Sequence, residues 1–415
     1  MKRILHYVMA FVVVPFYVAC TQQYDEVSIA ANNQSNLKIS KEQALTYLYG
    51  DLRLVDEEKT RAGQSPRTVK SIKQLTGART RSGKTLPSDL LYIVEFEEGR
   101  GSAVLSADAR ITPVIAILDE SVLTEEDFAS SNTEEIGPYV ASLITNHAEA
   151  SVQNNRAGFL PHPGNTITDT IYYYNRPAFL RTKWGQGSPY NSLCSEIYGS
   201  NTSVGCTTVA MSQFIYHMKS EETTTITINN TPIDLELVSH CEYGQRSNST
   251  QKAEVAKLMY NVGVSLGIDY TSRKRTVKSS IVAAPFLQSM GFNNAQYIAY
   301  SDPIAQMKIY WAGQPIYMRG HDCNSENSGH AWLLDGWFEY KIACPRYTED
   351  GGVVNDFLTE KKVHCNFGWG GQCDGYYTNG IYDTTIQNSN IEVGSGDIVS
   401  SAGYNFDTDL YMVNY

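Results

Sequence analysis

A cysteine that directly follows a glycine opens a helix-like, largely apolar run near the middle of this 415-residue chain. The pair is Gly205-Cys206, and apolar residues recur from there to Met218. A thiol at a helix N-terminus lies beside the positive end of the helix dipole and beside unpaired backbone N–H groups, which stabilise the thiolate and lower its pKa. Because Gly205 has no Cβ, the backbone of a substrate could approach the sulfur. The pattern predicts a nucleophile at Cys206, with a small buried structural cysteine as the alternative.

A base for this thiol should come from a histidine, and His330 is the distinctive one among eight. It opens a strand-like run that ends at Trp337, in which every second side chain shares a face with the imidazole. A second strand pattern at residues 362–367 contains Asn366, whose side chain could accept a hydrogen bond from the imidazole and orient it, as in a Cys-His-Asn triad. Trp369 could shield that bond from water, or could pack on the glycines around it as a structural residue.

A glycine-rich turn carries Gln186, twenty positions before Cys206. A side-chain amide N–H2 is a suitable donor to a tetrahedral oxyanion, provided that the turn flanks the nucleophile. A glutamine in a turn is otherwise simply solvated, so the role of Gln186 depends on where the turn lies.

Four motifs in a fixed order closely resemble the streptopain family of papain-like cysteine proteases. They are Trp184-Gly185-Gln186 with Pro189-Tyr190-Asn191, Gly205-Cys206-Thr207-Thr208-Val209-Ala210-Met211-Ser212-Gln213, Gly329-His330-Ala331 with Asp335-Gly336, and Asn366-Phe367-Gly368-Trp369-Gly370-Gly371. The resemblance spans about residues 165–415. It implies a cysteine endopeptidase in which Cys206 is the nucleophile, His330 is the general base and acid, and Asn366 orients the imidazole. It further implies that Gln186 donates a hydrogen bond to the oxyanion. The residues that support the substrate cleft would be Gly205, Gly329 and Trp369.

The fold class that the resemblance implies is α+β, with a papain-like arrangement of a buried nucleophile helix packed against an antiparallel sheet or barrel. A small α+β prodomain should precede it, because residues 28–150 resemble a Spi-type propeptide, mainly through the segment from Leu91 to Leu118. Family members are made as zymogens. The prodomain would therefore act as an intramolecular inhibitor until it is removed, and the partners would be protein or peptide substrates.

Two departures from the family pattern stand close to the predicted site. Phe367 replaces the first tryptophan of the usual Asn-Trp-Gly-Trp-Gly-Gly, which keeps an aromatic wall but removes an indole N–H. The interval between His330 and Asn366 is also long, and residues 339–360 look like an insertion at a hairpin. We expect this insertion to border the cleft and alter access to it.

The predicted organisation has five parts along the chain. They are a lipoprotein-like signal peptide (1–20), a polar tether (21–37), a Spi-type prodomain (38–150), a linker or activation region (151–170) that contains Arg156, and a streptopain-like peptidase domain (171–415). Asn, Gly and Pro oppose regular structure in the linker, which makes it the expected site of activation cleavage or else an uncleaved connection.

Local patterns predict the elements of the N-terminal part. Ser40 begins a capping box, so a helix should start near residue 40, and a second helix is expected from Pro138 to Ala150. Residues 91–96 and 102–106 should form a β-hairpin, followed by a strand at 113–118. Residues 55–88, rich in Lys, Arg, Thr, Ser and Gly, are expected to form an exposed loop.

The first twenty residues have the form of an export signal, with a basic start and a short apolar run before Val18-Ala19-Cys20. Cys20 resembles the lipidated cysteine of a bacterial lipobox, so the protein should be exported as an outer-membrane lipoprotein or in secreted form. With Cys20 lipidated and Cys206 free as the nucleophile, six of the eight cysteines remain, and they could form up to three disulfides: Cys194, Cys241, Cys323, Cys344, Cys365 and Cys373. A zinc site at His364, Cys365 and Cys373 is a weaker alternative, because the C-x2-C spacing is missing.

Composition narrows the function classes. A net charge of −11 and the absence of a Lys/Arg cluster disfavour nucleic-acid binding, and no later apolar run is long enough to span a membrane. Contact with a membrane is expected only through the lipid anchor, and no cofactor or metal is expected. Two other functions remain open: a catalytically silent papain-like surface binding protein, and a Cys-His amidase or transglutaminase-like enzyme.

Overall fold

The computed structural model describes residues 37–415 except for 81–82, 131, 133–134, 154–169, 201, 242–246, 272–281, 322–328, 348–352, 380 and 382–410. Residues Leu37–Tyr415 form one compact unit. The predicted signal, Cys20, most of the tether, Arg156 and nearly all of the linker lie outside the described residues. The five-part division, including the cleavage between prodomain and peptidase domain, stays a prediction.

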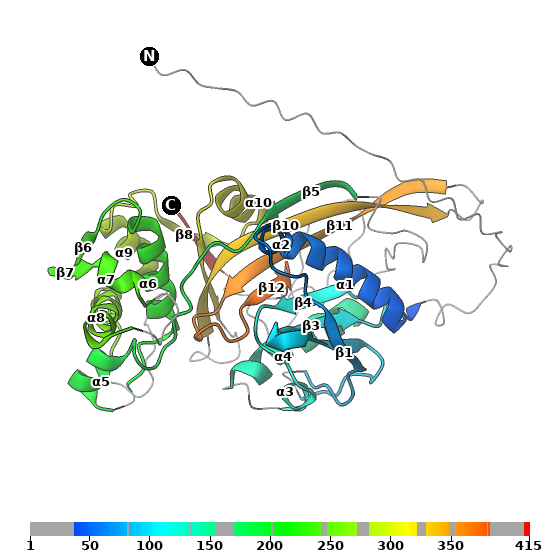
Figure 1. Cartoon of the computed structure of the whole chain (residues 1–415), viewed down its shortest axis with the longest axis horizontal. Coiled ribbons are helices and arrows are strands. Elements are labelled where there is room, and N and C mark those ends of the chain that lie inside the picture. Colours follow the sequence, from blue (N-terminus) through cyan, green and yellow to red (C-terminus); the bar gives the residue numbers. More distant parts are fainter. Residues whose placement is uncertain are drawn as a thin grey trace, which may run out of the picture. The chain divides into compact units, whose positions relative to one another are not determined.

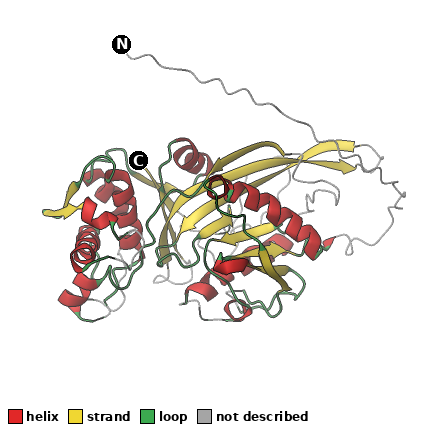
Figure 2. Ribbon diagram, in the orientation of Figure 1, coloured by secondary structure: helices red, strands yellow, loops and turns green. Residues whose placement is uncertain are grey.

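Helices and strands alternate irregularly along the chain (Figures 1 and 2). The helices are α1 (Lys41–Val55), α2 (Glu57–Arg61), α3 (Glu125–Ala129), α4 (Ile136–Gln153), α5 (Ser192–Tyr198), α6 (Cys206–Lys219), α7 (Leu235–Ser239), α8 (Ser249–Ser265), α9 (Ala283–Ser289), α10 (Asp302–Gln306) and the short η2 (Glu97–Gly99) and η5 (Met307–Trp311). The strands are β1 (Val69–Gln74), β2 (Leu91–Phe96), β3 (Ser102–Ser106), β4 (Val114–Leu118), β5 (Thr170–Arg176), β6 (Thr225–Ile228), β7 (Thr231–Asp234), β8 (Gln296–Ala299), β9 (Ile316–His321), β10 (Gly329–Tyr347), β11 (Val353–Asn366), β12 (Gly375–Thr378) and β13 (Tyr411–Asn414).

An antiparallel sheet of 11 strands runs through the described part of the chain. Its order is β1-β2-β3-β4-β12-β11-β10-β9-β13-β8, with β5 paired to β10. The pairing of β12 with β4, through Gly375 opposite Leu118, joins the strands of the predicted prodomain to those of the predicted peptidase domain. The mixture of helices with an antiparallel sheet confirms the predicted α+β class at this level.

The first four strands carry a helix on each face. Alternate residues of β2 point to opposite sides, so Val94 packs in one core with Leu48 of α1, while Ile93 packs in another with Val140 of α4. Both cores also contain side chains from β10, β11 or β12. The N-terminal part therefore shares its hydrophobic cores with the rest of the sheet.

The local predictions for this part are largely confirmed. Ser40 caps α1 in a full capping box with Gln43, α4 covers and extends the second predicted helix, and β2 to β4 match the predicted hairpin and strand. The expectation of one exposed loop at residues 55–88 is wrong, because α2 and β1 lie within it. Arg67 is buried there against Asp56, with guanidinium and carboxylate 2.8 Å apart, and a charged side chain satisfied in this way leaves no trace in a hydrophobicity pattern.

Helix α6 is the centre of a second, mainly helical core. Its residues from Thr207 to Tyr216 are all buried, which confirms the prediction of a helix enclosed on nearly every side. It packs on α8 on one side and on β9 and β10 on the other. The N-terminus of α6 is thereby held against β9 and the start of β10, where His330 lies.

Strands β10 and β11 form one long hairpin, visible in Figure 1 as the longest pair of strands. Leu333 pairs with Asn366 at one end, and Tyr347 pairs with Val353 at the other. Residues 339–347 and 353–360 lie in both strands at the end of the hairpin opposite His330. A hairpin at this position is as expected. The expectation that it borders the cleft is wrong for these residues, because continuous pairing carries them away from His330.

Five cysteine side chains are described, and none of these five forms a disulfide bond. Apart from Cys206 they are buried as small side chains in hydrophobic cores: Cys194, Cys241, Cys365 and Cys373. Cys323 and the side chain of Cys344 lie outside the described residues. The hypothesis of three disulfides is therefore wrong for four of its six members. Among the described residues, no helix is long and apolar enough to cross a membrane.

Candidate active site

Cys206 is the first residue of α6, as its sequence context predicts. Gly205 is the N-cap, with φ of +87°, a backbone conformation that side chains with a Cβ rarely adopt. A Cβ at this position would meet nothing within 4 Å. The glycine is therefore required by backbone conformation, and the space beside the nucleophile is open.

The thiol of Cys206 has an environment that favours the thiolate. Burial raises its pKa. The hydrogen bond and positive charge of His330, a hydrogen bond to the backbone of Ala331 and the charge of Arg319 lower it by more, so the pKa falls from the ordinary 9.0 to about 7. Arg319 and Ala331 are paired neighbours on β9 and β10. Strands β9 and β10 thus supply His330, Ala331 and Arg319, the groups that stabilise the thiolate.

His330 is held by a main-chain carbonyl and by aromatic rings. Its Nε2 lies 2.9 Å from the carbonyl oxygen of Phe367, and the Phe367 N–H donates to the carboxylate of Asp374 at 2.8 Å. The indole of Trp369 stacks on the imidazole with ring centroids 4.3 Å apart and an interplanar angle of 24°. With Nε2 engaged at the carbonyl, Nδ1 is the ring nitrogen left to face the thiol.

Asn366 lies next to this contact but is bonded elsewhere. Its Nδ2 donates to the carbonyl of Thr182 at 2.8 Å, and its Oδ1 accepts from Nε2 of Gln213 at 3.0 Å. The triad geometry drawn from the sequence therefore differs from the structure: the acceptor for His330 is the backbone of the next residue. The replacement of tryptophan by Phe367 matters little for this bond, because the acceptor is the backbone carbonyl of residue 367 and not its side chain.

Gln213 is a functional candidate that sequence reasoning missed. It is fully buried on α6, and its Oε1 accepts from the backbone N–H of Trp184 at 3.3 Å while its Nε2 reaches Asn366. It thereby ties the nucleophile helix to the turn that carries Gln186 and to the loop that carries Trp369. A polar residue on the inner side of an otherwise apolar helix was the available signal.

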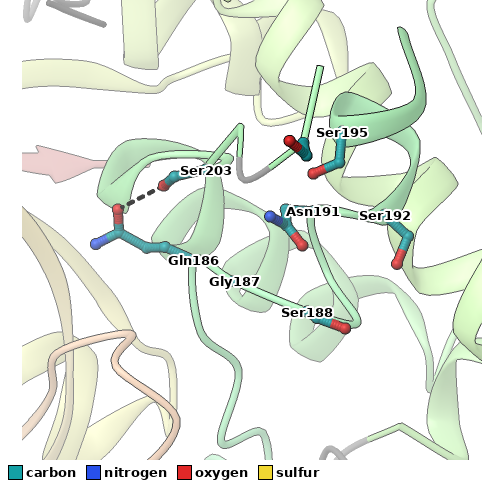
Figure 3. Close-up of a pocket in the computed structure, with 8 residues that line it drawn as sticks. Gln186, Gly187, Ser188, Asn191, Ser192, Ser195 and Ser203 are labelled. Atoms are coloured by element: carbon teal, nitrogen blue, oxygen red, sulfur yellow. Dashed lines mark hydrogen bonds between the residues drawn. The ribbon is translucent and has the colours of Figure 1, made fainter. Parts of the chain in front are cut away.

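The turn with Gln186 does flank the nucleophile segment. The backbone carbonyl of Gln186 accepts from the N–H of Val204 at 3.1 Å, and its side-chain Oε1 accepts from Ser203 at 3.2 Å. Figure 3 shows the amide nitrogen of Gln186 on the side away from Ser203. A hollow of about 470 Å³ opens here, lined by Gln186, Gly187, Ser188, Asn191, Ser192, Ser195, Ser200 and Ser203.

The remaining sequence candidates have structural positions. Gly329 is the first residue of β10 and pairs with His321, one step before His330. His364 bridges two carboxylates, with Nδ1 2.6 Å from Asp335 and Nε2 3.1 Å from Asp119. This occupies both ring nitrogens of the zinc alternative, and within the described ranges no group of three or more His, Cys, Asp or Glu side chains could hold a metal ion.

A tyrosine from the N-terminal part reaches the site. Tyr139 of α4 packs edge-on against Trp369, with centroids 5.5 Å apart, and against His330 at 6.2 Å. A helix that precedes the nucleophile by more than fifty residues thus touches the imidazole that faces it.

Comparison with known proteins agrees with this arrangement. Residues 184–377, which include Gln186, Cys206, His330 and Asn366, match the Peptidase C10 family. Streptopain of Streptococcus pyogenes is 23% identical over 386 residues, covering 83% of this chain and 85% of that protein, and the streptopain of serotype M1 is 22% identical over the same length.

One solved structure shows a similar fold. A fragment of Prevotella intermedia prointerpain A superposes with a TM-score of 0.50 at 18% identity, covering 84% of this chain and 98% of that one. Active interpain A cysteine protease of the same organism matches with a TM-score of 0.38 at 20% identity, covering 59% and 96%. The chain is thus similar in sequence to streptopain and in fold to prointerpain A.

Proposed function

We propose that this chain is a cysteine endopeptidase that is made as an inactive precursor. The observation that carries the proposal is the Cys206 thiol at the start of α6, bonded to His330 and with its pKa lowered to about 7 although burial opposes this. About half of the thiol would then be ionised at neutral pH. The similarity to streptopain and to the Peptidase C10 family supports the same reaction.

The proposed reaction uses the contacts of the site in sequence. The Cys206 thiolate attacks a peptide carbonyl, and the resulting oxyanion receives hydrogen bonds from the backbone N–H of Cys206 and the amide of Gln186, each donor contributing on the order of 3 kcal/mol. His330 gives its proton to the leaving amine as the C–N bond breaks. Water then hydrolyses the thioester, with His330 as base. The Phe367 carbonyl and Trp369 keep the ring aligned through both steps.

The precursor state is inferred from α4. Tyr139 covers His330 and Trp369, and the fold resembles a protein whose name marks it as a proenzyme. Residues 38–150 would then act as an intramolecular inhibitor, with activation by cleavage within 151–170. Export as a lipoprotein anchored at Cys20, or as a secreted protein, completes the proposal.

Two assays on the purified chain test the activity. We expect wild type to react with the cysteine-protease inhibitor E-64 and to digest casein after activation, whereas Cys206→Ala should do neither and should not process itself. Cys194→Ala, at a buried thiol elsewhere in the same helical core, is a control that should keep both properties. Casein digestion by Cys206→Ala would refute the proposal. Labelling without digestion would favour the amidase or transglutaminase-like alternative, and neither property in wild type would favour the silent binding protein.

A further inference from the structure

Ser203 stands between the nucleophile helix and the predicted oxyanion donor. It lies three residues before Cys206, in the loop segment that leads into α6, and it is half-buried. Its hydroxyl contacts two groups on opposite sides: the backbone N–H of Gly205 lies 3.2 Å from Oγ, and Oγ lies 3.2 Å from Oε1 of Gln186. Figure 3 shows the second of these bonds.

The direction of these two bonds follows from the chemistry of the groups. A backbone N–H can only donate, so the Ser203 oxygen accepts from Gly205. The hydroxyl proton is then available for the carbonyl end of the Gln186 amide, which accepts it. This leaves the N–H2 end of Gln186, with both of its donors, turned away from Ser203.

We infer that Ser203 is a positioning residue that fixes the amide of Gln186 with its N–H2 end toward the oxyanion. A side-chain amide can rotate by half a turn, and in the flipped form Gln186 would present an oxygen that repels the developing negative charge. The Ser203 bond favours the productive form. The inference rests on the proposed function, because it assigns a role in the same reaction.

The surrounding backbone supports this role by restricting every partner. The Gln186 carbonyl is bonded to the Val204 N–H, so the main chains on both sides of the relay are joined. The carbonyl of Gly205 accepts from the N–H of Val209 in the first turn of α6. The hydrogen bonds from Gln186 through Ser203 to Gly205 therefore link a fixed turn to a fixed helix start. Only the side-chain amide of Gln186 can adopt two orientations.

Stabilisation of the oxyanion by Gln186 and reactivity of the Cys206 thiol can be measured separately with two probes. A peptide aldehyde adds to Cys206 so that a carbon–sulfur bond forms and the carbonyl oxygen becomes a tetrahedral oxyanion, or its protonated form. Iodoacetamide alkylates the same sulfur with loss of iodide and forms no oxyanion. A group that acts through Gln186 should affect the first reaction and not the second.

We therefore expect Ser203→Ala to lower kcat about tenfold on a fluorogenic peptide chosen from the casein digest, with KM nearly unchanged, since one net hydrogen bond accounts for about that factor. Affinity for an aldehyde of the same peptide should fall by a similar factor, while the rate of alkylation by iodoacetamide stays as in wild type. Ser203→Thr, which keeps the hydroxyl, should restore kcat. Ser192→Ala, at another hydroxyl lining the hollow, is the matched control.

Two variants of Gln186 complete the test, and the first of them leaves Ser203 in place. Gln186→Glu can still accept from Ser203 but has no N–H2 group and adds a negative charge near the oxyanion, so it should be at least as impaired as Gln186→Ala. In the Gln186→Ala background, Ser203→Ala should cause no further loss.

A wild-type kcat and aldehyde affinity in Ser203→Ala would overturn the inference, and so would an equal loss in alkylation or a fully additive loss in the double variant. These outcomes differ from failure of the proposed function, in which wild type itself would neither bind E-64 nor cleave casein.

Discussion

At the scale of single residues, the reactivity of Cys206 results from two opposing effects. Burial disfavours its thiolate, while His330, Ala331 and Arg319 favour it, and the second effect is larger. The pKa of a buried thiol without such neighbours rises instead. At Cys373, burial raises the pKa to about 12. The same residue type is therefore inert at one position and reactive at the other.

The first prediction concerns this balance. The rate of Cys206 alkylation by iodoacetamide should rise with pH around a midpoint near 7, because only the thiolate reacts. His330→Ala removes the main stabilising partner while burial remains, so the midpoint should move to higher pH. His240→Ala, at an exposed histidine, should leave it unchanged. A midpoint that stays near 7 in His330→Ala would show that the imidazole does not stabilise the thiolate.

At the scale of elements, helix α4 contacts both the sheet and the candidate site. Its apolar residues pack on the sheet, and Tyr139 extends from the same helix to His330 and Trp369. The loop from Asn366 to Gly371 meets α4 on one side and the turn of Trp184 on the other, where the Gly370 N–H donates to the Trp184 carbonyl at 2.9 Å. We therefore propose that α4, which contacts His330 and Trp369 through Tyr139, limits access to the imidazole.

The second prediction follows from this contact. Tyr139→Ala in the intact, uncleaved chain should increase the rate of E-64 labelling by up to about tenfold, the effect expected from losing aromatic contacts of this kind. The measurement is a short labelling time course followed by mass spectrometry. Tyr49→Ala, at an exposed tyrosine of α1, should label as wild type does. Equal rates in all three proteins would mean that Tyr139 does not restrict the site.

At the scale of the whole molecule, two ion pairs, one buried and one partly buried, join the N-terminal part to β11. Lys362 pairs with Asp51 at 3.0 Å, both without solvent exposure, and His364 pairs with Asp119 at 3.1 Å while also bonding Asp335. The two residues of β11 are two positions apart and face the same way. Separation of the two parts would remove one carboxylate partner each from Lys362 and His364, which is costly for buried groups.

The third prediction uses the pH dependence of this cluster. Burial opposes the charge on His364, but Asp335 and Asp119 raise its pKa to about 10 from 6.5. The associated stability should be fully present below about pH 6.5 and should be lost as pH rises toward 10. Burial opposes ionisation of Asp119, but the hydrogen bond and charge of His364 outweigh it and lower the pKa of this carboxyl. Its own contribution to stability should therefore be lost only in acid.

The test is a series of thermal unfolding midpoints between pH 5 and pH 10. We expect wild type to lose stability across the upper half of this range, and Asp119→Asn to be less stable at pH 6 with a flatter profile. Asp89→Asn, which breaks an exposed pair with Lys38, is the control. A profile for Asp119→Asn that runs parallel to wild type would argue against the charged pair.

The sequence alone determined the elements whose causes are local. The capping box at Ser40, the glycine before Cys206 and the alternation around His330 each depend on neighbouring residues, and α1, α6 and β10 follow them. Residues with the right chemistry could also be named, because a thiol, an imidazole and an amide have few substitutes in such a reaction.

Only the tertiary structure decided which of these groups touch. The carbonyl of Phe367 rather than Asn366 receives His330, Ser203 rather than solvent meets Gln186, and Tyr139 reaches the site from a distant helix. These contacts depend on the register of β9, β10 and β11 and on how α6 and α4 pack against them. Register and packing come from the burial of side chains far apart in the chain, and no local pattern of residues carries that information.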